Sequence, residues 1–523
     1  MGLPILWLAG SALTTASTGG GLASTMLPIA LRDTGLLMAS VGLVSATLGF
    51  LAAWAVSHYE FPGRGVFDWA LMLPLAIPTY IAAYCFTELL DFTGPVQQAV
   101  RFATGAETAS GYWFPPIRSF GGGVLVLSLV LYPYVYAACR AFFLMQSGTT
   151  HAAARLLGAG GLRTLVAVTL PLSRPPLVVG ATLAMMEVVN DLGAVQYFGI
   201  NSITAIIYST WINRSNFGGA AQLAVTIVLV IAVLILAERG ARRAAGATAP
   251  RDTRVAPART PLRGARAVLA AGGCGLLLLV AFGLPVGQLV YLATRQLSVA
   301  AFAMAWPPLV ATVTLAAAGA FVTTAIGYFA AHRGRSSSRG ARAAIRIVTL
   351  GYAIPGTVLA LGLLQPLGLA DRWINGVTRW SLGWTPGLIL SGSIAALIYV
   401  YTIRFLAVSQ STLHEAMEKR GGSMLDAGRV LGARGVGLFL RVDLPTLSPA
   451  LLAAATLVFV EIIKELPATL LLRPLGVETL ATLVYAQANV GLFVQAALPA
   501  LAIVLAGLLP VVLATQLGSR RKV

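Results

Sequence analysis

Long apolar segments alternate along this chain with short segments that hold most of its arginines and lysines. A helix needs about 20 apolar residues to cross the hydrocarbon core of a bilayer, so the pattern predicts about 11–12 membrane-spanning helices. Residues 1–20 are interrupted by Ser, Thr and Gly and predict a short first span. The other predicted spans cover residues 36–57, 66–86, 121–143, 173–193, 220–237, 266–294, 306–331, 344–370, 387–408, 446–467 and 495–516.

The composition supports a polytopic membrane protein without a sizeable water-soluble domain. Hydrophobic residues make up 57% of the chain and charged residues 10%, whereas soluble domains carry about 25% charged residues. The net charge of +18 could suggest nucleic-acid binding, but the basic residues gather in loops between spans. That distribution follows the positive-inside rule for cytoplasmic loops. We therefore predict membrane lipid as a partner and no nucleic acid.

One basic segment divides the chain into two halves. Residues 239–265 contain several arginines and prolines and no long apolar run, which predicts a cytoplasmic linker. The predicted parts are a first repeat over residues 1–238, this linker, and a second repeat over residues 266–523.

A short amphipathic segment occurs once in each half. Residues 155–171 read RLLGAGGLRTLVAVTLP and residues 429–445 read RVLGARGVGLFLRVDLP, with Gly158 and Gly432 separated by 274 residues. Each copy is too polar to cross a bilayer, so we predict a short helix outside the membrane that contacts a partner. Six predicted spans separate the copies, so both lie on one side. The sequence thus predicts an all-α protein of two tandem, parallel six-helix repeats.

Each half also carries two carboxylates within the span that follows the amphipathic segment. These are Glu187 with Asp191, and Glu461 with Glu465. Residues four apart share a helix face, and charged groups inside a membrane normally face a cavity or a partner. The four carboxylates can line a translocation path, or they can pair structurally with Lys464 and Asn190.

Other candidate sites in the sequence favour a non-enzymatic protein. No GxxxxGK[ST] phosphate-binding loop occurs, and no nucleophile–base or metal-ligand constellation is present, so we predict no cofactor and no firmly assigned metal site. The three cysteines lack metal-ligand spacing and are expected to be buried. Arg140 and Arg404 are expected to anchor the inner ends of the spans that precede the amphipathic segments.

The repeated segment resembles the EAA motif of ABC-importer permeases. The second copy reads Asp426-Ala427-Gly428-Arg429 with Gly432 three residues later, and the first reads Ala152-Ala153-Ala154-Arg155 with Gly158. The resemblance implies a type I ABC-importer permease fold in which both segments dock on separate ATPase subunits. A proline is implied to begin the following helix. The implied ATPase-coupling residues are Ala152, Arg155, Gly158, Pro171, Asp426, Arg429, Gly432 and Pro445.

Within that group the chain looks most like the fused iron(III) permeases. Residues 112–119, 131–136, 196–199 and 464–474 carry this narrower resemblance. It implies a multi-pass protein of the bacterial plasma (inner) membrane that works with two ATPase copies and an extracytoplasmic binding protein. Thiamine, aminophosphonate and polyamine stay open as substrates, because related fused permeases share the motif. An ion-gradient-driven secondary transporter is the alternative from another class.

Overall fold

The computed structural model describes residues 2–16, 21–145, 154, 156–158, 160–246, 259–334, 340, 350–420 and 423–519. The chain forms two compact units, each built from separate stretches of sequence. Unit 1 contains residues 1–19, 297–487 and 505–523, and unit 2 contains residues 20–296 and 488–504.

Unit 2 is built around three long helices, α2, α6 and α10, which pack against one another. Small residues allow this close packing: a Cβ on Gly49 of α2 would lie 2.6 Å from the backbone oxygen of Tyr132 in α6. Its elements are α2 (Gly21–His58), β1 (Tyr59–Glu60), α3 (Arg64–Ala70), η1 (Leu73–Ala76), α4 (Thr79–Leu90), α5 (Pro95–Thr104), η2 (Ala109–Gly111), α6 (Phe120–Met145), α8 (Gly161–Thr164), η3 (Leu165–Thr169), α9 (Leu170–Leu172), α10 (Arg174–Asn190), α11 (Gly193–Tyr197), α12 (Ile203–Ile212), α13 (Phe217–Gly246), β2 (Thr260–Pro261), α14 (Ala265–Leu278), η4 (Leu279–Gly283) and α15 (Leu284–Thr294).

Unit 1 has an equivalent core of α16, α19 and α22. Small residues again set the distance between helices, because a Cβ on Gly327 of α16 would lie 2.8 Å from the Cβ of Ser409 in α19. Its elements are α1 (Gly2–Ala16), α16 (Val299–Gly334), η5 (Leu350–Ala353), α18 (Gly356–Leu382), α19 (Ile394–Arg420), α20 (Ser423–Val430), α21 (Gly435–Leu438), η6 (Phe439–Asp443), α22 (Leu444–Lys464) and α23 (Pro467–Leu472), with most of α24 (Leu480–Asn489) and the last part of α25 (Phe493–Ser519).

The compact units do not follow the halves of the sequence. The first helix, α1, belongs to unit 1, where it packs on α18. Trp7 donates a hydrogen bond from Nε1 to Oε1 of Gln365 at 3.0 Å. Conversely, α14 and α15 open the second half of the sequence but belong to unit 2, where α15 packs on α4. The predicted repeat boundaries stay a prediction about the sequence, and the compact units divide the chain differently, because each includes helical residues from the other half.

The apolar runs form helices as expected, although fewer of them are straight spans. Among the described residues, eight helices are long and apolar enough to cross a membrane, or ten if two bent pairs count as one span each. The bends are 94° between residues 64–76 and 79–104, and 62° between residues 165–172 and 174–190. The predicted span over residues 344–370 is different. Its described part joins η5 to α18, which is not among the spans and continues to Leu382.

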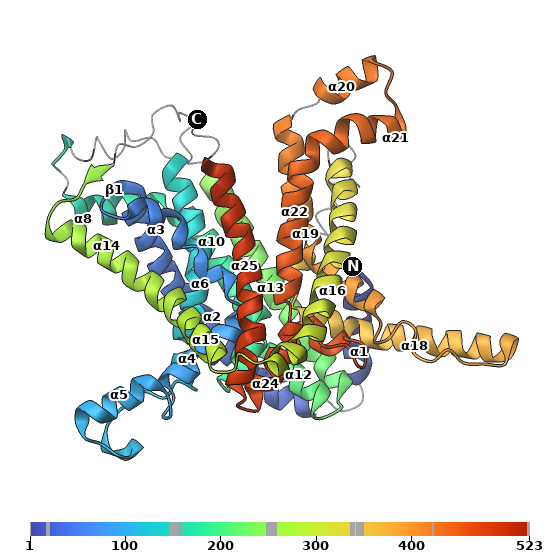
Figure 1. Cartoon of the computed structure of the whole chain (residues 1–523). Helices are drawn as coiled ribbons and strands as arrows, with labels where there is room; N and C mark the ends of the chain where they lie inside the picture. Colours follow the sequence, from blue (N-terminus) through green and yellow to red (C-terminus); the bar gives the residue numbers. More distant parts are fainter. Residues whose placement is uncertain are drawn as a thin grey trace. The chain divides into compact units, whose positions relative to one another are not determined.

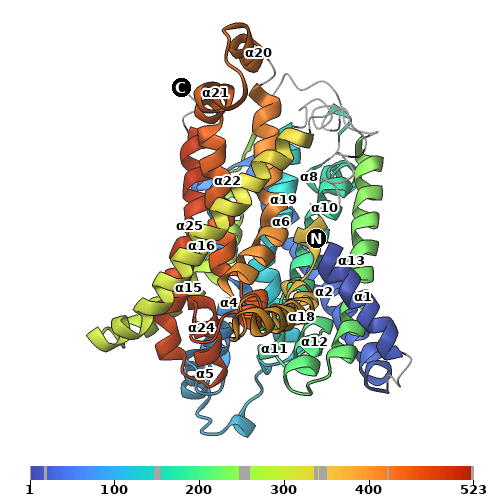
Figure 2. The same cartoon turned by 90° about the vertical axis from the view of Figure 1, so that its right-hand side faces the viewer.

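Figures 1 and 2 show the arrangement of the elements within unit 1. The short helices α20 and α21 lie at one end of α22. Helix α18 lies near the opposite end of this bundle, where α19 begins, and runs across the direction of α16 and α19. The two strands, β1 and β2, form a two-residue parallel pair in unit 2, and the other regular elements of the described chain are helices.

The duplication extends to individual hydrogen bonds. The hydroxyl of Thr34 in α2 accepts the backbone N–H of Ile203 at 2.9 Å. In the other unit, the hydroxyl of Thr312 in α16 accepts the backbone N–H of Leu480 at 2.8 Å. Each bond fixes the first residue of a short helix, α12 or α24, to the first long helix of its core. Two independent copies of one buried contact support the predicted internal repeat.

Candidate coupling loops and intramembrane charges

The second amphipathic segment forms a helix that stops at a left-handed glycine. Helix α20 ends at Val430, and Gly432 has φ of 87°. The Gly432 N–H bonds the Arg429 carbonyl and the Ala433 N–H bonds the Gly428 carbonyl, both at 3.0 Å. This is the Schellman arrangement, in which glycine adopts a backbone conformation that other residues reach only with strain. The chain can therefore reverse sharply before α21.

Two large apolar side chains precede the left-handed glycine in both copies. Val430 and Leu431 are 88% and 87% exposed in the second copy, and Leu156 and Leu157 are 90% and 87% exposed in the first. Gly158 has φ of 78°, like its counterpart. Sequence reasoning selected the glycines but missed these four apolar residues, whose shared position before each glycine was the available signal.

The other predicted coupling residues are distributed unevenly. Asp426 and Arg429 form an ion pair of 2.8 Å on the outer surface of α20, with both side chains more than half exposed. Such a pair contributes at most about 1 kcal/mol to stability, which leaves both groups available to a partner. Ala152 and Arg155 of the first copy lie outside the described residues.

The prolines of the motif follow a widened helical turn. The π-helices η3, η4 and η6 each end directly before a Leu-Pro pair. Proline lacks an N–H and its ring displaces the carbonyl four residues earlier, so a wider turn relieves the clash. Pro445 therefore does not start a separate helix, because residues 435–464 form one helix of 30 residues. Pro171 stands in α9, before the 62° bend.

A buried polar cluster lies at the base of the second segment. Asp443, the last residue of η6, accepts a hydrogen bond from the Tyr328 hydroxyl of α16 and contacts Nη1 of Arg420 at 2.5 Å. Arg420 ends α19 and also donates to the Thr446 hydroxyl at 2.7 Å. All three ionisable side chains are nearly inaccessible to water. This cluster, which sequence reasoning did not identify, joins the segment to two core helices.

The first copy lacks the acidic member of that cluster. Thr169 occupies the position equivalent to Asp443, and its hydroxyl donates to the Thr164 carbonyl at 3.3 Å. The two segments therefore share the left-handed turn and the exposed apolar pair but differ in the residue at their base.

Glu465 caps a short helix and pairs with an arginine. Its carboxylate accepts the backbone N–H groups of Ala468 and Thr469 at the start of α23, at 3.1 and 3.2 Å. Nη1 of Arg404 donates to Oε1 of Glu465 at 2.7 Å. The expectation that Arg404 anchors the inner end of a span was wrong, because α19 continues to Arg420.

Asp191 has the equivalent position in unit 2. Its Oδ1 accepts the N–H groups of Ala194 and Val195 in α11, at 2.8 and 3.3 Å. Among the described residues no arginine pairs with it, and the Thr79 side chain interacts with it instead. Gly356 occupies the place of Thr79 in unit 1, where a Cβ would lie 2.3 Å from Arg404 Nη1. The glycine provides the space that the arginine fills.

The remaining charges differ between the units. Glu461 is half-buried and forms an ion pair of 3.0 Å with Lys464, as the structural alternative expected. Glu187 is also half-buried, on α10. In unit 2, Arg140 is held by a two-pronged contact with Asp68, both bonds being 2.7 Å long. Whether the four carboxylates line a path stays a prediction.

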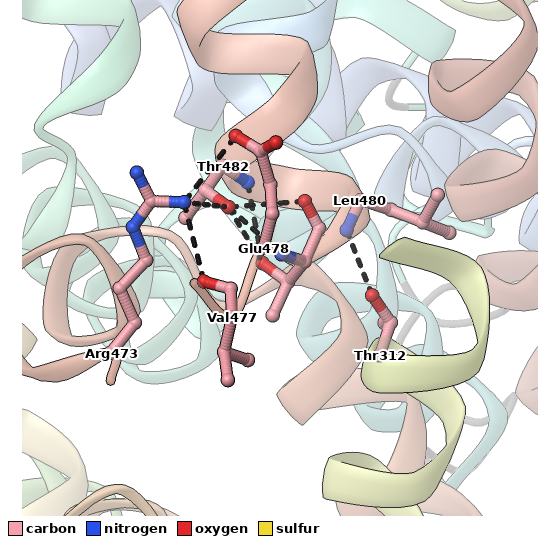
Figure 3. Close-up of polar contacts among 7 residues, drawn as sticks. Thr312, Arg473, Val477, Glu478, Leu480 and Thr482 are labelled. Atoms are coloured by element: carbon pink, nitrogen blue, oxygen red, sulfur yellow. Dashed lines mark hydrogen bonds and ion pairs between the residues drawn. The ribbon is translucent and has the colours of Figure 1, made fainter. Parts of the chain in front are cut away.

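A second polar network occurs after α23 (Figure 3). Nη1 of Arg473 donates to the Glu478 carboxylate and the Thr482 hydroxyl, at 3.3 and 3.2 Å. The same figure shows Leu480 bound to Thr312 of α16. Arg473 therefore holds the loop that leads into α24 in a defined conformation.

Part of this chain matches a known protein family, and most of it is similar to a transport permease. Residues 45–244 match the family model described as "Binding-protein-dependent transport system inner membrane component". The chain is 23% identical to the Fe(3+)-transport system permease protein FbpB 2 of Haemophilus influenzae, over 92% of this chain and 88% of that protein. It is 28% identical to the molybdenum transport system permease protein ModB of Escherichia coli, over 38% of this chain and 87% of that protein. It is 25% identical to the sulfate transport system permease protein CysT of Salmonella typhimurium, over 39% of this chain and 74% of that protein.

The family match, the full-length similarity and the apolar helices agree with one another. Residues 45–244 belong to the binding-protein-dependent transport family, and the chain is a multi-pass protein of the inner membrane.

Proposed function

We propose that this chain is the membrane subunit of an ATP-driven importer and that each amphipathic segment docks on one ATPase subunit. One observation carries the proposal: both segments present two exposed apolar side chains directly before a left-handed glycine. Exposed apolar side chains gathered at one point are typical of interaction sites. Two such sites fit two ATPase copies.

The second segment has the features of a lever. Helix α20 is joined through α21 and η6 to α22, and Asp443 ties this junction to α16 and α19. A displacement of α20 would therefore be transmitted to α16, α19 and α22 together. Asp426 and Arg429 provide the surface charge of this lever. Gly432 provides its turn, and Pro445 follows its widened helical turn. Gly158, Pro171, Arg155 and Ala152 are the proposed equivalents in the first segment.

We assign two steps of transport, ATP hydrolysis and substrate capture, to partner proteins. The sequence holds no nucleotide-binding loop of the GxxxxGK[ST] type, so we assign ATP hydrolysis to separate subunits. We assign substrate capture to an extracytoplasmic binding protein, as the family description implies.

Ferric iron is the substrate that the observations favour. The relative named for Fe(3+) transport aligns over both halves, whereas those named for molybdenum and sulfate align over 38% and 39% of the chain. The half-buried carboxylates Glu187 and Glu461 offer hard oxygen ligands, which suit a hard cation, and the charge of Glu461 is balanced by Lys464 at 3.0 Å. We propose that these two face the path, while Asp191 and Glu465 hold α11 and α23 at its side.

The coupling proposal is tested by making the exposed apolar positions charged. Leu431→Asp and Leu157→Asp should each weaken ATPase association by about 30-fold or more, the effect of losing a buried interface anchor. Leu475→Asp is the matched control, because Leu475 is fully exposed in the loop after α23. Pull-down of the ATPase and iron uptake in proteoliposomes with binding protein measure the outcome. Normal association in both segment variants would refute the docking assignment.

A further inference from the structure

The second half of α18 carries an apolar stripe that the described protein leaves uncovered. Leu369, Trp373, Val377 and Trp380 follow one another at spacings of three and four residues, which places them on one helix face. Trp373 and Trp380 are 72% and 90% exposed. Trp384, just beyond the helix, is also exposed.

The opposite face of α18 is held by the segment that returns to α19. The Asp371 carboxylate accepts the backbone N–H groups of Ile389, Leu390 and Ser391, at 3.0, 2.8 and 2.7 Å. Asn375 exchanges two hydrogen bonds with the backbone of Gly387, at 2.8 and 2.9 Å. This hairpin, residues 369–393, therefore holds its apolar stripe away from its own returning segment.

The exposed charges of the hairpin are all positive. Arg372 and Arg379 are exposed, and residues 372–393 contain no acidic side chain. Asp371 is buried and already accepts several hydrogen bonds. Tryptophan concentrates at the boundary between hydrocarbon and headgroups, and arginine beside it complements anionic headgroups.

The position of α18 fits that boundary. Its first residues, Gly356 to Leu363, are buried within unit 1. The helix then runs across the direction of α16 and α19, near the end of the bundle that lies opposite α20 (Figures 1 and 2). A helix that leaves the bundle at this level and in this direction lies parallel to the membrane surface.

We propose that the stripe of α18 lies in the outer interface of the bilayer and that Arg372 and Arg379 bind the phosphates of anionic phospholipids. The hairpin thereby anchors unit 1 in the leaflet that faces the binding protein. This proposal rests on the proposed function only for the side of the membrane, because α20 defines the cytoplasmic end.

Spin labels on the full-length protein in nanodiscs test the depth of the stripe. The variants are Trp380→Cys on the stripe and Leu382→Cys, an exposed apolar control on the opposite face. The described native cysteines are buried and can be replaced by serine. We expect the label at 380 to collide several-fold more with oxygen than with a water-soluble nickel chelate, and the label at 382 to show the reverse. Equal exposure of both labels to the nickel chelate overturns the proposal, as does protection at 380 only after binding protein or a second copy is added.

Two further measurements address the headgroups. The double variant Arg372→Gln/Arg379→Gln should retain phosphatidylglycerol at least tenfold less than the wild type in mixed-lipid nanodiscs, since each basic residue near an anionic surface contributes about fivefold. Retention equal to wild type removes the arginines from the proposal. Brominated lipids provide a reading without labels, because they should quench less fluorescence in Trp380→Phe than in the wild type. ATPase association should stay unchanged in these variants, so a failure here is distinct from a failure of the coupling proposal.

Discussion

Arg404 and Glu465 form a buried ion pair, with 2.7 Å between Nη1 and Oε1 and side-chain exposures of 11% and 1%. The same carboxylate caps α23, so one acidic group satisfies both a cation from α19 and the free N–H groups of a short helix. In unit 2 the equivalent Asp191 caps α11 and interacts with the Thr79 side chain. Both units therefore share a carboxylate that caps a short helix, but the side chain paired with it is Arg404 in unit 1 and Thr79 in unit 2.

Removing one member of this pair should be more harmful than removing both. Arg404→Met leaves Glu465 buried without its cation and should lower the free energy of unfolding by about 3–5 kcal/mol. Arg404→Met/Glu465→Gln should recover much of that loss, because no net charge stays buried. Thermal unfolding in detergent measures the effect, with the exposed Arg295→Met as control. A double variant no more stable than the single one would contradict the account.

The repeated threonine contacts should contribute similarly in the two units. Thr312→Val keeps the shape of the side chain but leaves the Leu480 N–H unpaired, at a cost of about 1–3 kcal/mol. Thr34→Val should have the same effect through Ile203. Thr314→Val is the control, because its exposed hydroxyl bonds only to its own helix. Unfolding curves that coincide for Thr312→Val and Thr314→Val would show that the contact contributes nothing.

The polar cluster below α20 should matter for energy transfer rather than for ATPase binding. Tyr328→Phe removes the hydroxyl bound to Asp443 and should reduce binding-protein-stimulated ATP hydrolysis by about 2- to 30-fold, the usual range for coupling residues. Association with the ATPase should stay the same. Thr169→Val in the first segment should have a smaller effect, because the Thr169 side chain carries no charge. Equal losses in both segments would argue against the asymmetry.

The hairpin of α18 should open in acid. Burial alone would raise the pKa of Asp371, but hydrogen bonds from Ser391, Leu390 and Ile389 hold that pKa below its usual range. A lowered pKa in the folded state means that the ionised group stabilises the hairpin fully above about pH 3.9, the unfolded value, and less as the pH falls further. Hydrogen exchange of residues 383–393 should therefore be slow at pH 5 and faster below about pH 4, after correction for intrinsic rates.

A variant provides the control for this pH dependence. Asp371→Asn should expose residues 383–393 at both pH values and remove the difference between them. A wild-type hairpin that stays equally protected at pH 3 would indicate that the carboxylate is not what holds it.

Much of the architecture follows from the sequence because apolar runs and helix periodicity are local properties. The helical apolar runs and the short amphipathic helix before Gly432 depend on neighbouring residues. The predicted span over residues 344–370 ended before the adjacent charges of Asp371 and Arg372. The helix continues for twelve residues beyond that predicted end, to Leu382, because Asp371 is satisfied by backbone N–H groups from the return segment.

The contacts that define the sites are not local, and this explains what the sequence did not reveal. Asp443 meets Tyr328 across 115 positions, and Arg404 meets Glu465 across 61. Nothing beside either residue indicates its partner. The exposure of Leu157 and Leu431 likewise depends on which surfaces the rest of the chain leaves open.

The attachment of α1 to α18 affects how the protein can be made. Trp7 and Gln365 are separated by 358 positions, and synthesis at about 5–20 residues per second takes roughly 20 to 70 seconds to cover that distance. During this time α1 has been synthesised, but α18, the helix on which it packs, has not. A ribosome that stalls anywhere before α18 therefore leaves an incomplete product in which α1 lacks the helix on which it packs in the complete protein.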